Sequence, residues 1–286
     1  MTARPDVVPF LDKPSGSYSY LVADMDRRRA AIVDPVLEYE PKAARTSTAG
    51  AERIVEEVER RGLAVDWILE THVHADRLSA GGFLRNRLGG RLAIGARVTE
   101  VQAALKERLG LDDLATDGSQ FDHLFADGEG FRVGSVAAHA FSTPGHTPAC
   151  LTYLIGDALF VGDTLFMPDS GTARCDFPGG DAHALYASIR KILRLPAETR
   201  IFVCHDYAPS REHRCETTVG AERSGNIHVN ERATEDEFVR LRKARDRTLE
   251  APTLILPSLQ VNLPGGRLPK PDAKGRVYLR IPLNVL

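Results

Sequence analysis

Short apolar runs typical of β-strands alternate along this 286-residue chain with amphipathic segments typical of helices. The strand-like runs cluster in the first quarter and the middle of the chain, and the helical segments lie between and after them. This order favours two sheets flanked by helices over a doubly wound parallel sheet. Strands are expected at 17–23, 29–36, 65–70, 91–94, 131–141, 150–155, 158–161 and 201–203, and helices at 51–61, 79–88, 98–109, 181–193 and 234–250.

Local signals predict where several of these elements begin and end. Gly62 ends the first helix, and Asp181 is a good N-terminal cap for a later one. Thr234-x-x-Glu237 has the spacing of a capping box, in which each of the two residues caps the other. Gly156 is the first of two residues between strand-like runs, which predicts a hairpin with a type II′ turn.

The length of the chain allows one large domain or two small ones. The sequence contains no internal repeat, no low-complexity tract and no evident linker. We therefore expect a single domain over 1–286, in which 251–286 form a C-terminal arm packed on the body. Prolines and glycines punctuate this arm.

The composition argues against several classes of function. The 37 Lys and Arg residues nearly balance the 39 Asp and Glu residues, so the basic footprint of a nucleic-acid-binding protein is missing. No apolar run approaches the ~18 residues of a membrane span, and the first residues lack the apolar core of a secretory signal. We expect a cytoplasmic protein that binds neither nucleic acid nor membrane.

The strongest chemical signal is Thr71-His-Val-His-Ala-Asp76, directly after the strand expected at 65–70. It places three metal-ligating side chains, His72, His74 and Asp76, within five residues. The two histidines share a face if the strand continues, and Asp76 reaches the same point only if the chain bends. Taken alone, the pattern also fits a pair of solvated loop histidines.

Three further strand ends carry the same kinds of residue. His146 lies in a Thr-Pro-Gly-His-Thr turn, Asp163 follows an apolar run in Val-Gly-Asp-Thr, and His205 follows another in Cys-His-Asp. Each of these would be an ordinary turn on its own. Because four strand ends each supply a histidine or an aspartate, the set predicts a metal centre built from these strand ends.

These motifs resemble a known family. THVHAD, TPGHT, GDTLF and CHDY, in this order, closely resemble the metallo-β-lactamase superfamily and its glyoxalase II and persulfide dioxygenase branch. The segments GTARCDFP at 171–178 and LILPSLQVN at 254–262 resemble bacterial persulfide dioxygenases in particular. The resemblance implies an α/β protein with the αβ/βα sandwich, in which two mixed β-sheets are flanked by helices.

The resemblance also implies a cofactor, one non-haem Fe(II) per chain held by His72, His146 and Asp163. Two imidazoles and one carboxylate form a facial triad that leaves coordination positions open, although Zn or Mn could occupy the same ligands. The residues that would orient these ligands or line a vacant second site are His74, Asp76, Arg77 and His205.

Arg77 departs from the superfamily pattern His-x-His-x-Asp-His. A guanidinium group stays protonated and offers no lone pair, so it cannot bind a metal ion. In hydrolases like glyoxalase II the missing histidine belongs to a second metal site, together with Asp76 and His205. Arg77 therefore favours the mononuclear dioxygenase. Its own effect stays open: altered substrate access, lost activity, or help in holding an anionic persulfide.

The implied reaction is oxidation of glutathione persulfide by O₂ to sulfite and glutathione, a step in sulfide detoxification. In this interpretation Asp176 accepts a hydrogen bond from a ligand imidazole. Tyr207 donates a hydrogen bond to substrate or to a water on the metal, and Arg174 binds a glutathione carboxylate. A purely structural hydrogen bond is the alternative for each of the three residues.

Two alternative functions stay open. One is a glyoxalase II-like hydrolase of glutathione thioesters, which two metal ions per chain would favour. The other is a non-catalytic protein that binds metal or persulfide. A homodimer is compatible with the chain, although nothing in the sequence requires one.

Overall fold

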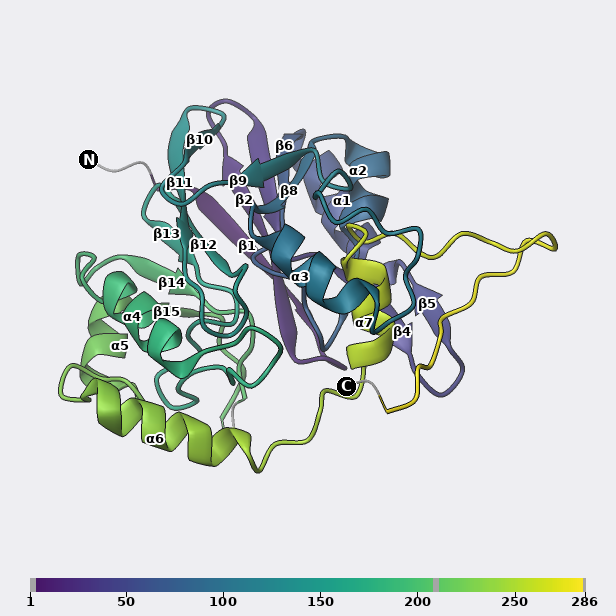
Figure 1. The fold of residues 1–286 in the computed structure, drawn as a ribbon. Coiled ribbons are helices and arrows are strands. Elements are labelled where there is room, and N and C mark those ends of the chain that lie inside the picture. The colour runs from purple at the N-terminus through teal and green to yellow at the C-terminus, as the bar shows by residue number, and fades with distance from the viewer. Residues whose placement is uncertain (1–3, 208–210, 285–286) are drawn as a thin grey trace.

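The structure is a computed structural model that describes residues 4–207 and 211–284. In this part of the chain, two six-stranded mixed sheets face each other, and helices cover their outer faces (Figure 1). The first sheet has the order β1-β2-β3-β6-β8-β9, and the second has the order β10-β11-β12-β13-β14-β15. A small third sheet, β5-β4-β7, lies beside them.

The strands of the first sheet are β1 (Asp6–Asp12), β2 (Ser17–Asp24), β3 (Arg29–Val33), β6 (Ala64–Leu69), β8 (Arg91–Gly95) and β9 (His123–Phe125). Those of the second are β10 (Gly130–Val133), β11 (Val136–Ser142), β12 (Leu151–Ile155), β13 (Ala158–Phe160), β14 (Arg200–Phe202) and β15 (Glu216–Thr218). The small sheet consists of β4 (Val36–Glu40), β5 (Arg45–Ser47) and β7 (Leu78–Ser79).

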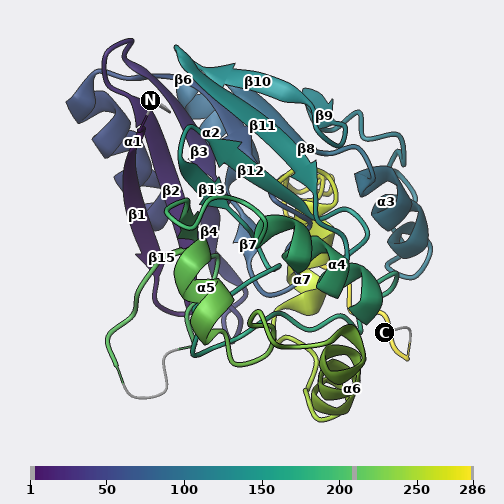
Figure 2. The same cartoon turned by 90° about the vertical axis from the view of Figure 1, so that its left-hand side faces the viewer.

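The helices fall into two groups (Figure 2). Those beside the first sheet are α1 (Ala49–Arg61), α2 (Gly81–Leu88), α3 (Val98–Lys106) and α7 (Ile255–Asn262). Those beside the second sheet are α4 (Ala182–Ile192), α5 (Val219–Gly225) and α6 (Glu235–Asp246). No helix among the described residues is both long and apolar enough to cross a membrane.

Three layers of apolar side chains hold these sheets and helices together. Because neighbouring residues of a strand point to opposite faces, β2 contributes Tyr20 and Val22 to the layer between the sheets and Leu21 to the layer under α1–α3. Leu185 and Ile189 of α4 pack on the outer face of the second sheet. Both faces of each sheet are therefore covered, which explains the nearly continuous apolar runs in the sequence.

Most of the elements expected from the sequence are present. Gly62 ends α1 in the left-handed conformation, the side chain of Asp181 caps α4, and the capping box of Thr234 and Glu237 is formed. At the β12–β13 hairpin, Gly156 alone has a positive φ, of 61°, as the first position of a type II′ turn requires.

The structure differs from the expectation in several places, and it also contains elements that were not expected, among them β1, β5, β9, β15 and α5. The run at 131–141 is interrupted at Gly134, which has a φ of 56° and turns the chain from β10 into β11. The helix expected at 234–250 already ends at Asp246. The C-terminal segment contains a buried helix, α7, where only short apolar pieces were expected, and the chain after it runs over the surface (Figure 1).

The site is created where strand ends from both sheets meet. β3 and β6 run parallel, and so do β13 and β14, so the chain leaves each pair at the same edge. Contacts across the seam fix this edge: the Tyr18 amide donates to the Cys204 carbonyl at 2.8 Å, and the Tyr20 hydroxyl donates to the Val203 carbonyl.

The turn before His146 makes a close contact that can be tested by mutation. Gly145 has a φ of 145°, and a Cβ added there would overlap the backbone of Leu185 in α4. We expect Gly145→Ala to lower the free energy of unfolding by about 2–4 kcal/mol, through backbone strain plus overpacking. Chemical denaturation measures this loss. Gly16→Ala is the matched control, because Gly16 also has a positive φ, of 65°, but has open space around it. Equal losses in the two variants would contradict the predicted clash.

Candidate metal centre

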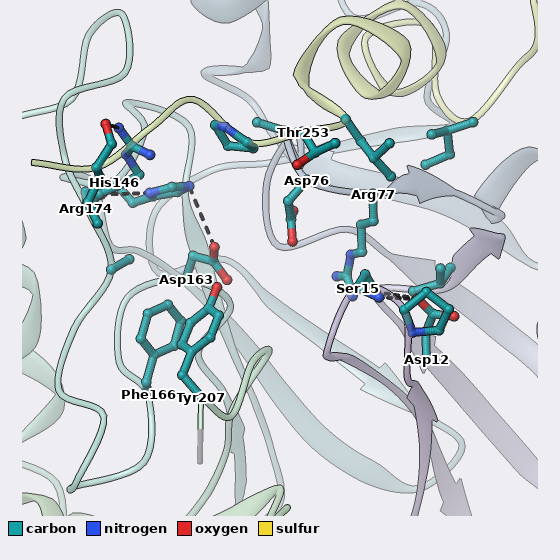
Figure 3. A pocket seen from close by; sticks show the side chains of 18 of the residues that line it. Asp12, Ser15, Asp76, Arg77, His146, Asp163, Phe166, Arg174, Tyr207 and Thr253 are labelled. Carbon is teal, nitrogen blue, oxygen red and sulfur yellow. Dashed lines mark hydrogen bonds and ion pairs between the residues drawn. The ribbon is translucent and has the colours of Figure 1, made fainter. Parts of the chain in front are cut away.

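Three side chains that could bind a metal ion converge at the sheet edge from three separate loops. His72 follows β6, His146 follows β11, and Asp163 follows β13. Their ligating atoms all lie within 4.8 Å of one another, and all three residues are buried. Figure 3 shows His146 and Asp163 pointing toward each other, with 3.8 Å between Nε2 and Oδ2.

In both imidazoles, a hydrogen bond at Nδ1 fixes the orientation of the ring. Nδ1 of His72 lies 3.1 Å from the Thr71 hydroxyl, and Nδ1 of His146 lies 2.8 Å from the Arg174 carbonyl. Each ring is thus left with its Nε2 facing the other ligands. Such partners fix the tautomer and the orientation of a histidine that binds a metal ion.

Two buried polar atoms of this group have no hydrogen-bond partner in the described part of the chain and could bind a metal ion. Nε2 of His72 and Oδ1 of Asp163 are buried and have no hydrogen-bond partner among the described residues. Leaving a buried polar atom unpaired costs about 1–3 kcal/mol, which a bound cation would recover. Burial, together with the neighbouring His74 and His146, holds the pKa of His72 well below its usual value. The imidazole is therefore neutral, the form that ligates a metal.

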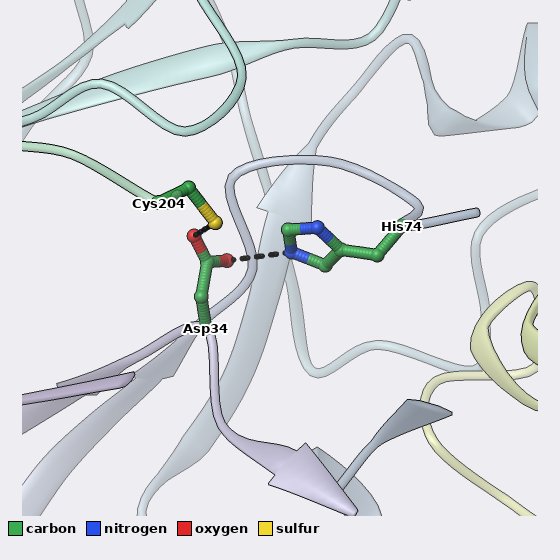
Figure 4. A group of neighbouring side chains, drawn as sticks. All are labelled: Asp34, His74 and Cys204. Atoms are coloured by element: carbon green, nitrogen blue, oxygen red, sulfur yellow. Dashed lines mark hydrogen bonds and ion pairs between the residues drawn. The ribbon is translucent and has the colours of Figure 1, made fainter. Parts of the chain in front are cut away.

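A second buried cluster lies behind this triad. Figure 4 shows Asp34 between Cys204 and His74, with Oδ1 of Asp34 3.1 Å from Nε2 of His74 and Oδ2 3.8 Å from Sγ of Cys204. Asp34 also accepts hydrogen bonds from the backbone amide and the hydroxyl of Thr71, both at 2.8 Å. It therefore connects the end of β3 to the loop that carries His72.

Arg77 inserts its guanidinium into this cluster. Nη2 lies 2.9 Å from Nε2 of His74, 3.1 Å from Sγ of Cys204 and 3.8 Å from Oδ2 of Asp34. The side chain is only 2% exposed. The residue that replaces the expected histidine thus places a permanent positive charge in the interior, next to the triad.

Asp76 and His205 pair with each other beside Asp163. Nε2 of His205 lies 3.1 Å from Asp76 and 3.5 Å from Oδ1 of Asp163. Burial lowers the pKa of His205, but the two carboxylates outweigh this effect and raise it. All the histidines and aspartates singled out at the four strand ends therefore lie at this one edge.

The expected role of Asp176 is wrong. No hydrogen bond joins it to a ligand imidazole; its carboxylate instead binds the guanidinium of Arg174, with distances of 2.6 and 2.8 Å. The imidazole of His146 is held by the main-chain carbonyl of Arg174. A third nitrogen of Arg174 donates to the Glu250 carbonyl at 2.6 Å, so this guanidinium is engaged within the protein.

Tyr207 lies at the mouth of the site. Its ring stacks on His205, with 5.5 Å between centroids, and it meets the edge of Phe166 at 5.1 Å. Figure 3 shows its hydroxyl directed toward Asp163. The side chain is 59% exposed, and it is placed where it can touch a molecule entering the pocket.

A cavity of about 1100 Å³ opens over the triad. Its walls come from the β1–β2 turn, the β4–β5 hairpin, the loop after β13, and the segment between α6 and α7. This volume is large for O₂ or a single inorganic anion and admits a molecule of oligopeptide size. The residues that line it include Asp76, Arg77, His146 and Asp163.

Sequence reasoning missed two residues of the site. Asp34 follows the apolar strand β3 in the same way that Asp163 follows β13, and this parallel could have identified it. Asn262, which binds the loop of His74 from α7, had no local signal, because its partners lie 183–188 residues away.

Comparison with known proteins identifies the family of the chain. The family described as "Metallo-beta-lactamase superfamily" matches residues 12–205. A beta-lactamase hydrolase-like protein of Xylella fastidiosa is 53% identical over 283 residues, which cover 99% of this chain and 65% of that protein. The present chain thus spans less than two thirds of that relative's length. Glyoxylase B2 of Dictyostelium discoideum is 45% identical over 288 residues, covering 99% and 98% of the two chains.

Two further similar proteins carry the name ETHE1. The human mitochondrial persulfide dioxygenase ETHE1 is 33% identical over 196 residues, which cover 68% of this chain and 65% of that protein. The crystal structure of ETHE1 from Myxococcus xanthus superposes with a TM-score of 0.74 at 28% identity, covering 92% and 100%. The chain belongs to the metallo-beta-lactamase superfamily, and its two mixed sheets flanked by helices are the fold of that family.

Proposed function

We propose that this protein is a mononuclear iron-dependent persulfide dioxygenase that oxidises glutathione persulfide. The observation that carries the proposal is a complete buried triad of His72, His146 and Asp163, with a guanidinium where a ligand of a second metal would be needed. The similarity to proteins named persulfide dioxygenase or ETHE1 supports the same reaction. Three donors on one side of a metal ion leave adjacent positions for two reactants.

The reaction converts a persulfide R–S–SH, O₂ and water into R–SH, sulfite and two protons. Iron at the triad would supply adjacent coordination positions and the one-electron steps that triplet O₂ needs to react with a closed-shell sulfur. The cavity would hold the peptide part of the substrate and bring its outer sulfur to the triad, which replaces a bimolecular encounter with fixed geometry.

Two side chains next to the triad would act on the substrate itself. The charge of Arg77 lowers the energy of a negative charge nearby, so it favours the persulfide in its anionic form. The hydroxyl of Tyr207, which is directed toward Asp163, is available to donate a hydrogen bond to that anion. Since Arg174 is engaged by Asp176 and by Glu250, we assign it to holding His146 and the pocket wall rather than to binding a substrate carboxylate.

A thioester hydrolase is the second candidate. The observation that favours it is that Asp76 and His205 remain next to Asp163, so two further donors lie beside the triad. The relatives named glyoxylase and hydrolase-like point the same way. The two candidates differ in the number of metal ions per chain and in the need for O₂.

The assay that tests the proposed function combines two readouts. Protein loaded with Fe(II) under argon is mixed with glutathione persulfide and air-saturated buffer, and O₂ uptake and sulfite are measured in the same sample. We expect one sulfite for each O₂ consumed, because both oxygen atoms end on the outer sulfur. Absence of uptake with iron bound, together with hydrolysis of an acylated glutathione, would establish the hydrolase instead.

The His146→Ala variant tests the triad. We expect it to lose bound iron and all oxygenase activity, because two remaining ligands bind Fe(II) too weakly to retain it through purification. Metal analysis and circular dichroism report on iron content and fold. His183→Ala is the control, since His183 lies on the surface of α4 and pairs with Glu235 alone among the described residues. Normal iron and activity in His146→Ala would rule out the assigned ligands.

The Arg77→His variant tests the guanidinium. We expect its metal content to rise from one to two ions per chain, because the substitution removes a buried positive charge and restores a ligand. Arg77→Lys is the control: it keeps the charge and should keep a single metal. Inductively coupled plasma mass spectrometry on both variants gives the counts. Two metals in the unmodified protein would contradict the mononuclear assignment.

A further inference from the structure

We propose that Asn262, the last residue of α7, is a positioning residue that sets the path of the loop carrying His72. The inference rests on the triad as a metal site, but it does not depend on which reaction the metal serves. Asn262 is 5% exposed and lies 188 residues from His74 in the sequence.

The side-chain amide of Asn262 uses both of its donors and its acceptor on this one loop. Nδ2 donates to the carbonyl oxygens of His74 and Arg77, at 2.8 and 2.7 Å. Oδ1 accepts a hydrogen bond from the amide of Ser79 at 2.7 Å. Because three main-chain groups within six residues bind one planar amide, the curvature of the loop between them is fixed.

This loop has little regular structure of its own. The residues between β6 and β7 form no helix or longer strand, and β7 is only two residues long. Yet the loop must hold His72 against its triad partners while it directs Arg77 into the interior. Asp34 binds the beginning of the loop through Thr71, and Asn262 binds its end, so His72 lies between two fixed points.

Asn262 can act as a fixed point because α7 is itself rigidly packed. Leu259, Val261 and Leu263 lie in the apolar layer under the first sheet. The carbonyl of Leu263 accepts a hydrogen bond from the buried Gln102 of α3 at 3.0 Å. Residues that hold ligands from a rigid element are expected to affect metal affinity without touching the metal ion.

Asn262→Asp tests this role with a minimal change in shape. A carboxylate still accepts from the Ser79 amide, but it cannot donate, and it sets negative charge against the two carbonyl oxygens. We expect the affinity for Fe(II), and for Co(II) as a spectroscopic probe, to fall about 10–100-fold. The visible absorption of bound Co(II) should change as well, because the position of His72 in the triad relaxes.

Gln260→Glu is the matched control in the same helix. Gln260 is also buried, and its amide also makes three hydrogen bonds to main-chain groups, with Leu256 and Arg280 rather than with the metal loop. A merely structural contribution predicts similar losses of melting temperature in both metal-free variants. We expect only Asn262→Asp to change the metal affinity and the Co(II) spectrum.

The titrations use metal alone, without persulfide or O₂, so an error in the proposed reaction would leave their outcome unchanged. Unaltered affinity and spectrum in Asn262→Asp would overturn the positioning role. If that variant does not fold, Asn262→Ala decides, because it removes the same hydrogen bonds without adding a charge. Failure of both Asn262 variants to fold, while Gln260→Glu folds, would assign Asn262 to stability and also overturn the proposal.

Discussion

The buried carboxylate of Asp34 is the constraint on which the site depends. Its backbone has a φ of 51°, a conformation that costs a non-glycine residue about 1–2 kcal/mol. Burial would raise its pKa, but His74, Arg77 and the Thr71 amide outweigh burial and lower the pKa. A charge buried in this way requires a positive partner, and removing one partner from such a pair costs about 3–5 kcal/mol. The strain at Asp34 and the burial of Arg77 are thus two parts of one arrangement.

The same arrangement keeps the candidate metal-binding side chains in place within the protein. Each sheet supplies candidate ligands at its edge, so their spacing depends on how the two sheets meet. The hydrogen bonds of Tyr18 and Tyr20 fix that seam, and Asp34 ties the seam to the loop of His72. Nearby, the Thr71 hydroxyl and the Arg174 carbonyl orient the two imidazoles. A metal ion binding here would therefore meet ligands that lose little further conformational freedom.

Sequence reasoning could identify the strand-end histidines and aspartates because a strand end is a local pattern. It could not assign partners to their neighbours. Asp176 lies two residues from Arg174, and which of the many nearby donors it binds depends on the fold of the whole loop. The helix α7 was missed because Pro257 suggests a break, yet proline is tolerated in the first turn of a helix. The contact of Asn262 with His74 joins segments that no local pattern connects.

Arg77 also bears on the choice between oxidation and hydrolysis. A hydrolase with two metal ions uses them together to generate a hydroxide and to stabilise the leaving group. A guanidinium supplies charge next to the triad. Unlike a metal ion, it cannot coordinate a water molecule and thereby lower the pKa of that water. The guanidinium is part of the polypeptide, unlike a bound metal ion, so its charge persists when the metal is lost. A site with one metal and one fixed cation can attract an anionic sulfur and still leave the metal open to a second reactant. This combination suits an oxygenase better than a hydrolase, and it is the physical basis for our proposal.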